Sequence, residues 1–284
     1  MKKGLNLWSL NWSARKGQPS FRDVVRIAKS IGYQGIELTF DEENLDPKKE
    51  TEKQVAQFKV EAASAGVELP SVATGIFWKF NLGSGDKKLR EAGIAMGKYA
   101  LRLASIVGTK VLLVVPGVSE ASTSYRKTYD FSKESVLQMV ETAEKFDVTI
   151  GIENVWNRFL YSPLEFKEFV EEIGSKKVGA YLDLANIVEI GHPLHWIEEL
   201  GGRIVMVHAK DFDSSVGNIS AFRHIGKGNV DWKEAVSALR RVRYDGYLIV
   251  ECPPSFTPGL RNPTFEDARR LAEENSKALD GILK

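Results

Sequence analysis

Four side chains of types that bind divalent metal ions stand at the ends of four apolar segments in the second half of the chain. The segments VTIGIEN, VGAYLDLAN, IVMVHAKD and GYLIVECP present Glu153, Asp183, His208 and Glu251. A strand that is buried on both faces reads as a continuous apolar run, so a charged group at its end lies at the mouth of a sheet. Three carboxylates and an imidazole brought together there would repel one another without a cation. The pattern therefore predicts a metal-dependent enzyme.

The elements that must position these side chains alternate regularly along the sequence. Eight apolar segments are each followed by a helical pattern, and four of the helical patterns stop at glycine, namely Gly32, Gly66, Gly108 and Gly174. Alternating strands and helices imply a parallel sheet with right-handed crossovers. Eight such units in 284 residues predict an α/β fold, a single (β/α)8 TIM barrel domain over residues 1–284. An open doubly wound sheet is the alternative, but it usually has a glycine-rich turn after its first strand, and SLNWS at 9–13 has no glycine.

Active-site groups of such barrels come from the carboxyl ends of the strands, where the four residues fall on strands five to eight. Carboxylates and an imidazole without a thiolate suit manganese, magnesium or cobalt. Two remaining octahedral positions would accept the carbonyl and neighbouring hydroxyl of a sugar, and the metal would stabilise the resulting enediolate. Glu153 and Glu251 would transfer the proton. Transfer across the two faces of one carbon is epimerisation, transfer between neighbouring carbons is aldose–ketose isomerisation, and the residues leave both open.

Each of these residues has a plainer interpretation when it is taken singly. Glu153 at a strand end could be a capping or rim charge. Asp183 could cap the next helix, and His208 could be a hydrogen-bonded core histidine. The occurrence of all four at the same end of successive strands favours the joint interpretation.

At these residues the chain resembles the xylose isomerase-like barrels, in particular the D-tagatose 3-epimerase, L-xylulose or L-ribulose 5-phosphate 3-epimerase and hexulose-phosphate isomerase group. The resemblance covers nearly the whole chain and is carried by IENVWNRFLYSPLEF, YLDLANIVEIGHPLHWI, RIVMVHAKDF, HIGKGNVDW and YLIVEC. It implies one divalent metal, usually manganese, on Glu153, Asp183, His208 and Glu251. It also implies that Glu153 and Glu251 are the acid–base pair.

Departures from this family bear on the substrate. Asn186 stands where ketohexose epimerases often have a histidine that contacts a substrate oxygen, and we expect Asn186 to contact the substrate because an asparagine can still donate a hydrogen bond. Leu160 stands where tagatose epimerases have a glutamate. The loop after the seventh strand offers Lys210, Arg223 and His224, and an arginine fork binds a carboxylate or phosphate in bidentate fashion. We therefore expect an anionic ketose, a keto-aldonate such as a 5-ketogluconate or a ketose phosphate, ahead of a neutral ketohexose.

Further residues are placed near the mouth by the pattern. Trp12 and Trp78 are expected to wall the substrate pocket. Glu37, at the end of GIELTF, is a possible hydrogen-bond partner inside the mouth, but a rim charge is the favoured interpretation. The polar segment PGVSEASTSYRKTYD at 116–130 has no periodicity and is expected to be a mobile lid. Lys110 opens the fourth strand at the opposite end and is not a site candidate.

The composition limits which classes of partner we expect. A net charge of +1 gives no electrostatic reason to expect a nucleic acid or a membrane surface. No apolar run approaches the roughly 18 residues of a spanning helix, and the start of the chain is interpreted as a strand rather than a signal peptide. A single cysteine, Cys252, fits a cytoplasmic protein. A small sugar or sugar acid is the expected ligand, and the resemblance makes a homo-oligomer possible.

Three rival functions use the same residues differently. An endonuclease IV-like DNA repair enzyme would need a cluster of many histidines, and the chain has four. A glycoside hydrolase with Glu153 and Glu251 as its carboxylate pair would leave Asp183 and His208 unexplained. A non-catalytic sugar-binding barrel would have no need of two opposed bases.

Overall fold

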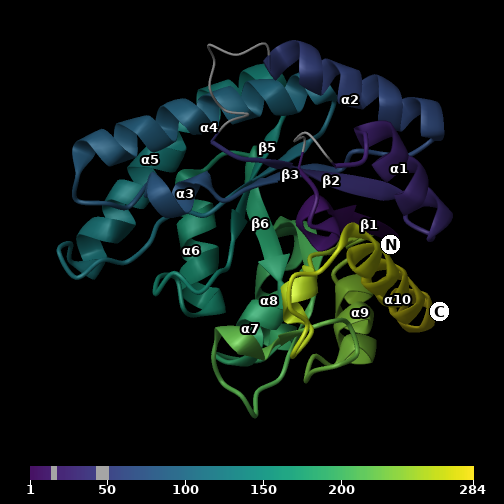
Figure 1. Cartoon of the computed structure of the whole chain (residues 1–284). Coiled ribbons are helices and arrows are strands. Elements are labelled where there is room, and N and C mark those ends of the chain that lie inside the picture. The colour runs from purple at the N-terminus through teal and green to yellow at the C-terminus, as the bar shows by residue number, and fades with distance from the viewer. Residues whose placement is uncertain (14–17, 43–50) are drawn as a thin grey trace.

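The strands form a closed parallel barrel (Figure 1). The computed structural model describes residues 1–13, 18–42 and 51–284, and eight strands of this part of the chain pair in the order β1-β10-β7-β6-β5-β4-β3-β2. These strands are β1 Lys2–Asn6, β2 Gly35–Phe40, β3 Ser71–Thr74, β4 Val111–Val114, β5 Thr149–Glu153, β6 Val178–Asp183, β7 Ile204–Ala209 and β10 Tyr247–Val250. The expected (β/α)8 barrel is confirmed.

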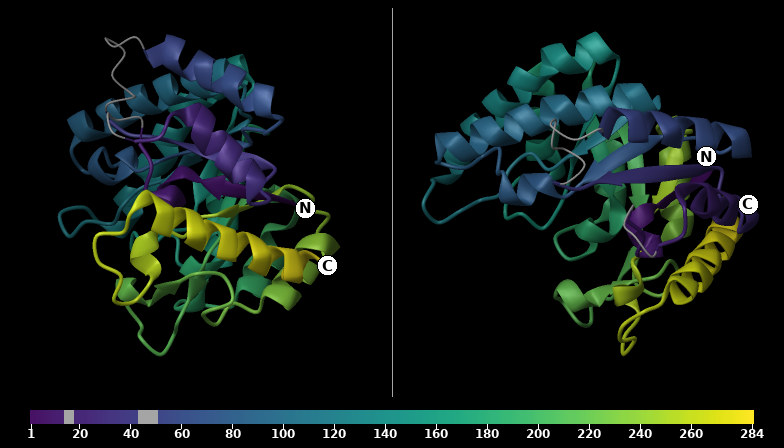
Figure 2. Two further views of the ribbon diagram at one scale, coloured as in Figure 1. Left: turned by 45° about the vertical axis from the view of Figure 1, so that its right-hand side comes forward. Right: turned by 45° about the horizontal axis from the view of Figure 1, so that its top comes forward.

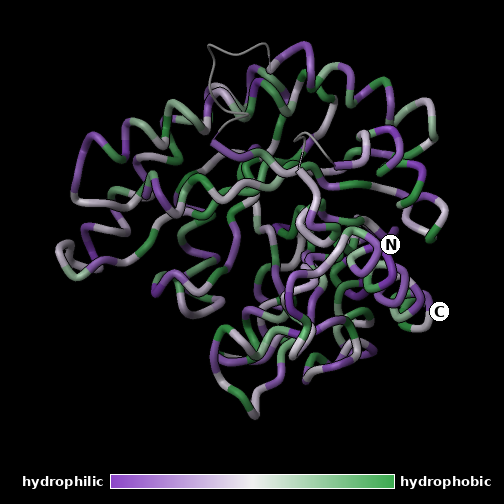
Figure 3. The backbone as a smooth tube through the Cα atoms, in the orientation of Figure 1, coloured by the Kyte–Doolittle hydropathy of each residue, from purple (hydrophilic) through white to green (hydrophobic). Residues whose placement is uncertain are grey.

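Helices cover the outside of the barrel on all sides (Figure 2). They are α1 Phe21–Ser30, α2 Thr51–Ala65, α3 Ile76–Lys79, α4 Lys87–Val107, α5 Tyr125–Phe146, α6 Pro163–Ile173, α7 Leu184–Val188, α8 Pro193–Leu200, α9 Trp232–Arg241 and α10 Phe265–Leu283. Along the longer helices, hydrophobic and hydrophilic residues both occur within each turn (Figure 3). In α1, for example, Val24, Val25 and Ala28 are buried, as the helical spacing in the sequence predicts.

Side-chain caps and glycines define where several helices begin and end. Ser20, Ser124 and Ser162 each accept a backbone N–H in the first turn of α1, α5 and α6. Gly108 and Gly174 follow α4 and α6 with φ of 86° and 71°, a left-handed conformation that glycine adopts without steric cost. The short connections after Gly108 and Gly174 lead to the amino ends of β4 and β6, and because the strands are parallel their carboxyl ends share one rim.

The two ends of the chain meet on one side of the barrel. The terminal ammonium group of Met1 lies 2.7 Å from Asp245 Oδ1, and α10 packs against β1. The N and C labels lie close together in Figures 1 and 2. The pairing of β1 with β10 closes the barrel here, with Gly4 opposite Ile249.

The structure changes two expectations about the loops. Residues 125–130 of the expected lid are the first turns of α5, in which Thr128 and Tyr129 are buried, so the lid interpretation of 116–130 is wrong for this half. The loop after β7 contains a short antiparallel pair, β8 Asp211–Phe212 and β9 Phe222–Arg223, that the sequence pattern did not indicate.

The opposite end of the barrel agrees with expectation. Lys110 precedes β4 and pairs with Asp147, which follows α5 and precedes β5, away from the strand ends that carry the site. No helix within the described residues is both long enough and apolar enough to cross a membrane.

Candidate metal centre and its cavity

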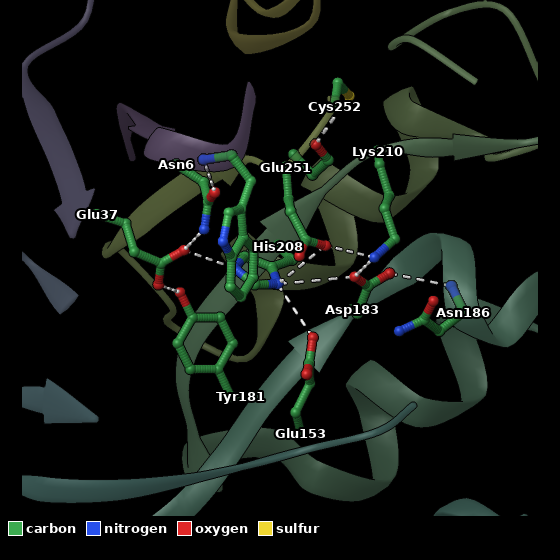
Figure 4. Close-up of polar contacts among 12 residues, drawn as sticks. Asn6, Glu37, Glu153, Tyr181, Asp183, Asn186, His208, Lys210, Glu251 and Cys252 are labelled. Atoms are coloured by element: carbon green, nitrogen blue, oxygen red, sulfur yellow. Dashed lines mark hydrogen bonds and ion pairs between the residues drawn. The ribbon is translucent and has the colours of Figure 1, made fainter. Parts of the chain in front are cut away.

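Four side chains from neighbouring strands converge at the carboxyl end of the barrel (Figure 4). Glu153 and Asp183 are the last residues of β5 and β6, His208 lies near the end of β7, and Glu251 directly follows β10. One ligand atom from each of the four lies within 4.8 Å of every other. The structure thus brings together the four residues that the sequence placed at successive strand ends.

The spacing of these atoms suits one divalent cation. His208 Nδ1 lies 3.1 Å from Glu153 Oε1, 3.6 Å from Glu251 Oε2 and 3.7 Å from Asp183 Oδ2. Ligands at the usual bond lengths of about 2.1 Å lie roughly 3 Å apart at adjacent corners of an octahedron and about 4.2 Å apart at opposite corners. The four donors, all oxygen or imidazole nitrogen, therefore fit manganese, magnesium, cobalt or zinc both in chemistry and in spacing.

Strand register explains how the side chains meet. Asp183 pairs with His208 across β6 and β7, and Glu153 pairs with Tyr181 across β5 and β6. Asn154 fixes the end of β6, since its side chain accepts the Asp183 N–H and donates to the Asp183 carbonyl, both at 2.8 Å. Strand register thus places Asp183 beside His208, and the Asn154 side chain fixes the strand end that carries Asp183.

Asp183 divides its two carboxylate oxygens between two roles. Oδ1 accepts the N–H of Asn186 at 3.0 Å and caps α7, as the plainer interpretation of this residue predicted. Oδ2 is buried and lies 3.7 Å from His208 Nδ1 and 2.6 Å from the ammonium group of Lys210. This buried carboxylate oxygen thus faces positive charge, the environment in which a carboxylate can also ligate a metal ion.

Burial and neighbouring charges shift the acidity of the cluster. Burial raises the pKa of Glu153 to about 7, with His208 opposing the shift and Glu251 adding to it. Burial also raises the pKa of Asp183. Burial by itself would lower the pKa of His208, but Glu251, Glu37 and Glu153 together raise it well above its ordinary value. Burial by itself would raise the pKa of Glu251, but Lys210 and His208 lower it, so Glu251 is the carboxylate of the cluster that most readily stays ionised.

Lys210 lies among the acidic residues rather than free for a substrate. Its Nζ is 2.6 Å from Asp183 Oδ2 and 2.5 Å from Glu251 Oε2. Burial would lower the pKa of Lys210, but Asp183 and Glu251 raise it above its ordinary value. Lys210 is thus a permanent cation against two of the four candidate ligands, although it also reaches the cavity wall.

A cavity of about 920 Å³ opens above the cluster. Of the substrate contacts expected from the sequence, Trp12, Trp78, Asn186 and Lys210 line it, together with Glu153 and Glu251. Its wall is strongly aromatic, formed by Trp8, Trp12, Trp78, Trp156, Phe40, Phe58, Phe222 and Phe256. Four of the six tryptophans of the chain therefore face one space.

The structure directs Arg223 and His224 elsewhere. Arg223 donates to Asp213 Oδ2 at 3.2 Å and to the Ser220 carbonyl at 2.6 Å, and His224 lies between Thr257 and Asn275. Neither is among the described residues that line the cavity. The bidentate contact expected of Arg223 has no support in this arrangement, because a neighbouring aspartate in its own loop already engages the guanidinium group.

Glu37 is the residue whose position the sequence interpretation missed. It is fully buried rather than a rim charge, and its Oε2 lies 2.8 Å from His208 Nε2. Glu37 pairs in register with Asn6 of β1, whose side chain donates to it at 2.6 Å. The sequence did contain a signal for this position, because Glu37 lies inside the apolar strand GIELTF rather than after it. A side chain inside a barrel strand faces either the core or the surrounding helices, so it is buried in both cases.

Comparison with known proteins agrees with this architecture. A family model described as a xylose isomerase-like TIM barrel matches residues 25–279. The L-ribulose-5-phosphate 3-epimerase UlaE of Shigella flexneri is 25% identical over 80% of this chain and 80% of that protein. An uncharacterized protein of Methanocaldococcus jannaschii is 28% identical over 65% of this chain and 64% of that protein, so the chain spans somewhat less than two thirds of this relative.

Solved structures resemble the barrel over its whole length. A D-psicose 3-epimerase crystallised in the presence of D-fructose has a TM-score of 0.80 at 18% identity, covering 100% of this chain and 99% of that one. The IolI protein with a zinc atom has a TM-score of 0.80 at 19% identity, covering 99% of each chain. The similarity to the L-ribulose-5-phosphate 3-epimerase supports an enzyme of the isomerase type. The family match shows that the chain belongs to the xylose isomerase-like TIM barrel family.

Proposed function

We propose that this protein is a divalent-metal-dependent epimerase of a ketose-type sugar. The observation that carries the proposal is the placement of Glu153 and Glu251 in one cavity, each from a different strand end and each in the four-residue cluster. The similarity to L-ribulose-5-phosphate 3-epimerase over most of the chain supports the reaction class.

The four residues of the cluster would have two kinds of role, metal binding and proton transfer. A divalent cation on Glu153, Asp183, His208 and Glu251 would polarise a ketose carbonyl and so acidify the neighbouring carbon. One of the two glutamates would remove the proton from one face of that carbon, and the other would return a proton to the opposite face. Asp183 and His208, which are both fully buried, hold the cluster without facing the open cavity.

The cavity wall also suits a sugar. The apolar faces of a sugar ring or chain pack against aromatic side chains, while a few polar groups fix its orientation. Trp12 is buried and Trp78 is 49% exposed, so together they extend from the floor of the cavity to its rim. Asn186 offers its side chain at the same wall.

The residues that line the cavity and the named substrate of the UlaE relative favour substrates of different charge. Among the described lining residues Lys210 is the one cation, and it is paired with Asp183 and Glu251. Without the Arg223 contact, this wall favours a neutral ketose over the anionic one expected from the sequence. The phosphate named for the UlaE relative favours a ketose phosphate.

Proton exchange measured by NMR tests the function and the substrate together. The protein, loaded with Mn²⁺ for turnover and freed of it before spectra are recorded, would be incubated in deuterated water with neutral ketoses, keto-aldonates and ketose phosphates. We expect loss of one carbon-bound proton signal and formation of the epimer, both abolished by EDTA. Exchange between neighbouring carbons would instead identify an aldose–ketose isomerase. Activity that survives EDTA, or bond cleavage of a glycoside, would contradict the proposal.

A further inference from the structure

Glu37 occupies the centre of a buried polar network on the side of His208 opposite the metal cluster (Figure 4). Its Oε1 accepts hydrogen bonds from Ser71 Oγ at 2.7 Å and from the Tyr181 hydroxyl. Its Oε2 accepts one from Asn6 Nδ2 at 2.6 Å and lies 2.8 Å from His208 Nε2. Glu37, Asn6, Ser71 and His208 are each no more than 1% exposed, as is Tyr181. Four partners thus use the roughly four acceptor sites of one carboxylate.

In the neutral ring, the form in which histidine ligates a metal ion, the network determines which nitrogen of His208 carries the proton. Asn6 Oδ1 accepts the N–H of Trp8 at 2.7 Å, so the amide nitrogen of Asn6 must point at Glu37. An ionised carboxylate can only accept, and three of its partners already donate to it. His208 Nε2 must therefore donate to Glu37 Oε2, which leaves Nδ1 as the ring atom that faces Glu153, Asp183 and Glu251.

We propose that Glu37 is a positioning residue for the metal centre, holding His208 as the Nε2–H tautomer with its Nδ1 lone pair aimed at the cation. A carboxylate that accepts the other ring N–H of a ligating histidine fixes the ring orientation and makes the ligating nitrogen more basic. The inference rests on the metal dependence in the proposed function. Glu37 would thus contribute to metal binding although it is not one of the four candidate ligands.

The strands that hold Glu37 give this role a structural basis. The cluster itself comes from β5, β6, β7 and the end of β10, whereas Glu37, Asn6 and Ser71 come from β2, β1 and β3. Register places Asn6 beside Glu37 in the barrel wall. The first three strands, which contribute no ligand to the cluster, thus support it through one hydrogen bond to His208.

Metal binding measured on folded protein tests the role without reference to turnover. Calorimetric titration of Zn²⁺ into metal-free wild-type protein would be compared with the same titration of Glu37→Gln, which keeps the size of the side chain and removes its charge. We expect the affinity of Glu37→Gln to fall about 10- to 100-fold. Glu68→Gln is the matched control, because it makes the same chemical change at an exposed residue that pairs with Lys2 outside this network, and its affinity should equal that of wild type.

A second measurement uses the wild-type protein alone and so does not depend on the folding of a variant. Long-range ¹H–¹⁵N correlation spectra of ¹⁵N-histidine-labelled, Zn²⁺-loaded protein should show His208 ligated through Nδ1 and protonated at Nε2. Ligation through Nε2, or equal affinity of Glu37→Gln and wild type, would overturn the role of Glu37 and leave the proposed reaction standing. Normal metal binding without proton exchange on any ketose would contradict the proposed epimerase reaction and leave the role of Glu37 unaffected. A wild-type protein that binds no divalent cation would overturn both.

Discussion

The ammonium group of Lys210 lies 2.6 Å from Asp183 Oδ2, the same oxygen that faces His208 and the candidate cation position. A buried lysine in this place neutralises part of the acidic cluster and at the same time repels a second cation. Breaking a buried ion pair from one side leaves an uncompensated charge and costs about 3 to 5 kcal/mol. Removal of the Lys210 charge should therefore lower the stability of the metal-free protein and raise its affinity for metal.

The first prediction concerns this lysine. Lys210→Met should lower the free energy of unfolding of the metal-free protein by about 3 kcal/mol, because Asp183 and Glu251 lose their buried partner. Saturating Mn²⁺ should stabilise Lys210→Met more than it stabilises wild type. Urea denaturation with and without metal measures both effects. Lys110→Met, at an exposed pair with Asp147, should change neither quantity, and equal stabilisation of wild type and Lys210→Met by metal would argue against the competition.

The second prediction concerns the acid–base pair. Glu153→Gln and Glu251→Gln should each lower the rate of epimer formation about 10²- to 10⁴-fold, since an amide cannot accept the transferred proton. Because both residues are also candidate ligands, the rates are to be compared at saturating Mn²⁺ with metal content measured. A variant that retains its metal and its full rate would remove that glutamate from the proton-transfer step.

The third prediction concerns Asp211, which organises the loop after β7. Its Oδ1 accepts the N–H groups of Phe212 and Val230, both at 3.0 Å, and its Oδ2 accepts Gly226 N–H at 2.9 Å and Trp232 Nε1–H at 3.1 Å. The amide group of Asp211→Asn would face one of these two pairs of donors, and facing Gly226, which is exposed, and Trp232 costs less because only the Trp232 donor is buried. Chemical denaturation should therefore show a loss of about 1 to 3 kcal/mol.

Asp231→Asn provides the matched control for Asp211→Asn. Asp231 caps α9 by accepting the N–H of Glu234 at 3.0 Å, and asparagine caps helices as well as aspartate does. The same chemical change should therefore have no measurable effect on stability at this position. Equal losses in the two variants would mean that the cost comes from the lost charge rather than from the stranded donors.

The fourth prediction concerns pH and His224. Burial lowers the pKa of His224 below its ordinary value of 6.5. Its Nδ1 lies 2.9 Å from Asn275 Nδ2, and Asn275 Oδ1 accepts the N–H of Ile225, so this nitrogen must accept rather than donate. Protonation of His224 Nδ1 would make this atom a donor that faces the donor Asn275 Nδ2. Below pH 6.5 the unfolded chain binds the proton more readily than the folded protein, so the stability that His224 contributes is present above this pH and is lost as pH falls.

Thermal unfolding at pH 8 and pH 5.5 checks the sign of this effect. The stability advantage of wild type over His224→Gln should be larger at pH 8 than at pH 5.5, because glutamine does not titrate. An advantage that grew toward low pH would mean that His224 is protonated in the folded protein.

Much of this protein could be predicted from its sequence, and the reason is periodicity. Eight apolar strand segments, each followed by an amphipathic helix, leave a closed parallel barrel as the arrangement that buries every strand on both faces. In such a barrel all strand carboxyl ends share one rim, so Glu153, Asp183, His208 and Glu251 could be placed together without coordinates. The structure brings these four residues within reach of one cation.

The tertiary structure alone decided which other residues surround this cluster. The sequence shows that Glu37 lies in a strand, but only the closed barrel places β2 across from β7 and brings its carboxylate to His208. Loop residues follow no period, so the contact of Arg223 with Asp213, in place of a substrate, could not be read from spacing. Strand ends are positioned by local pattern and register, whereas the partner of a long polar side chain depends on the elements that the fold packs against it.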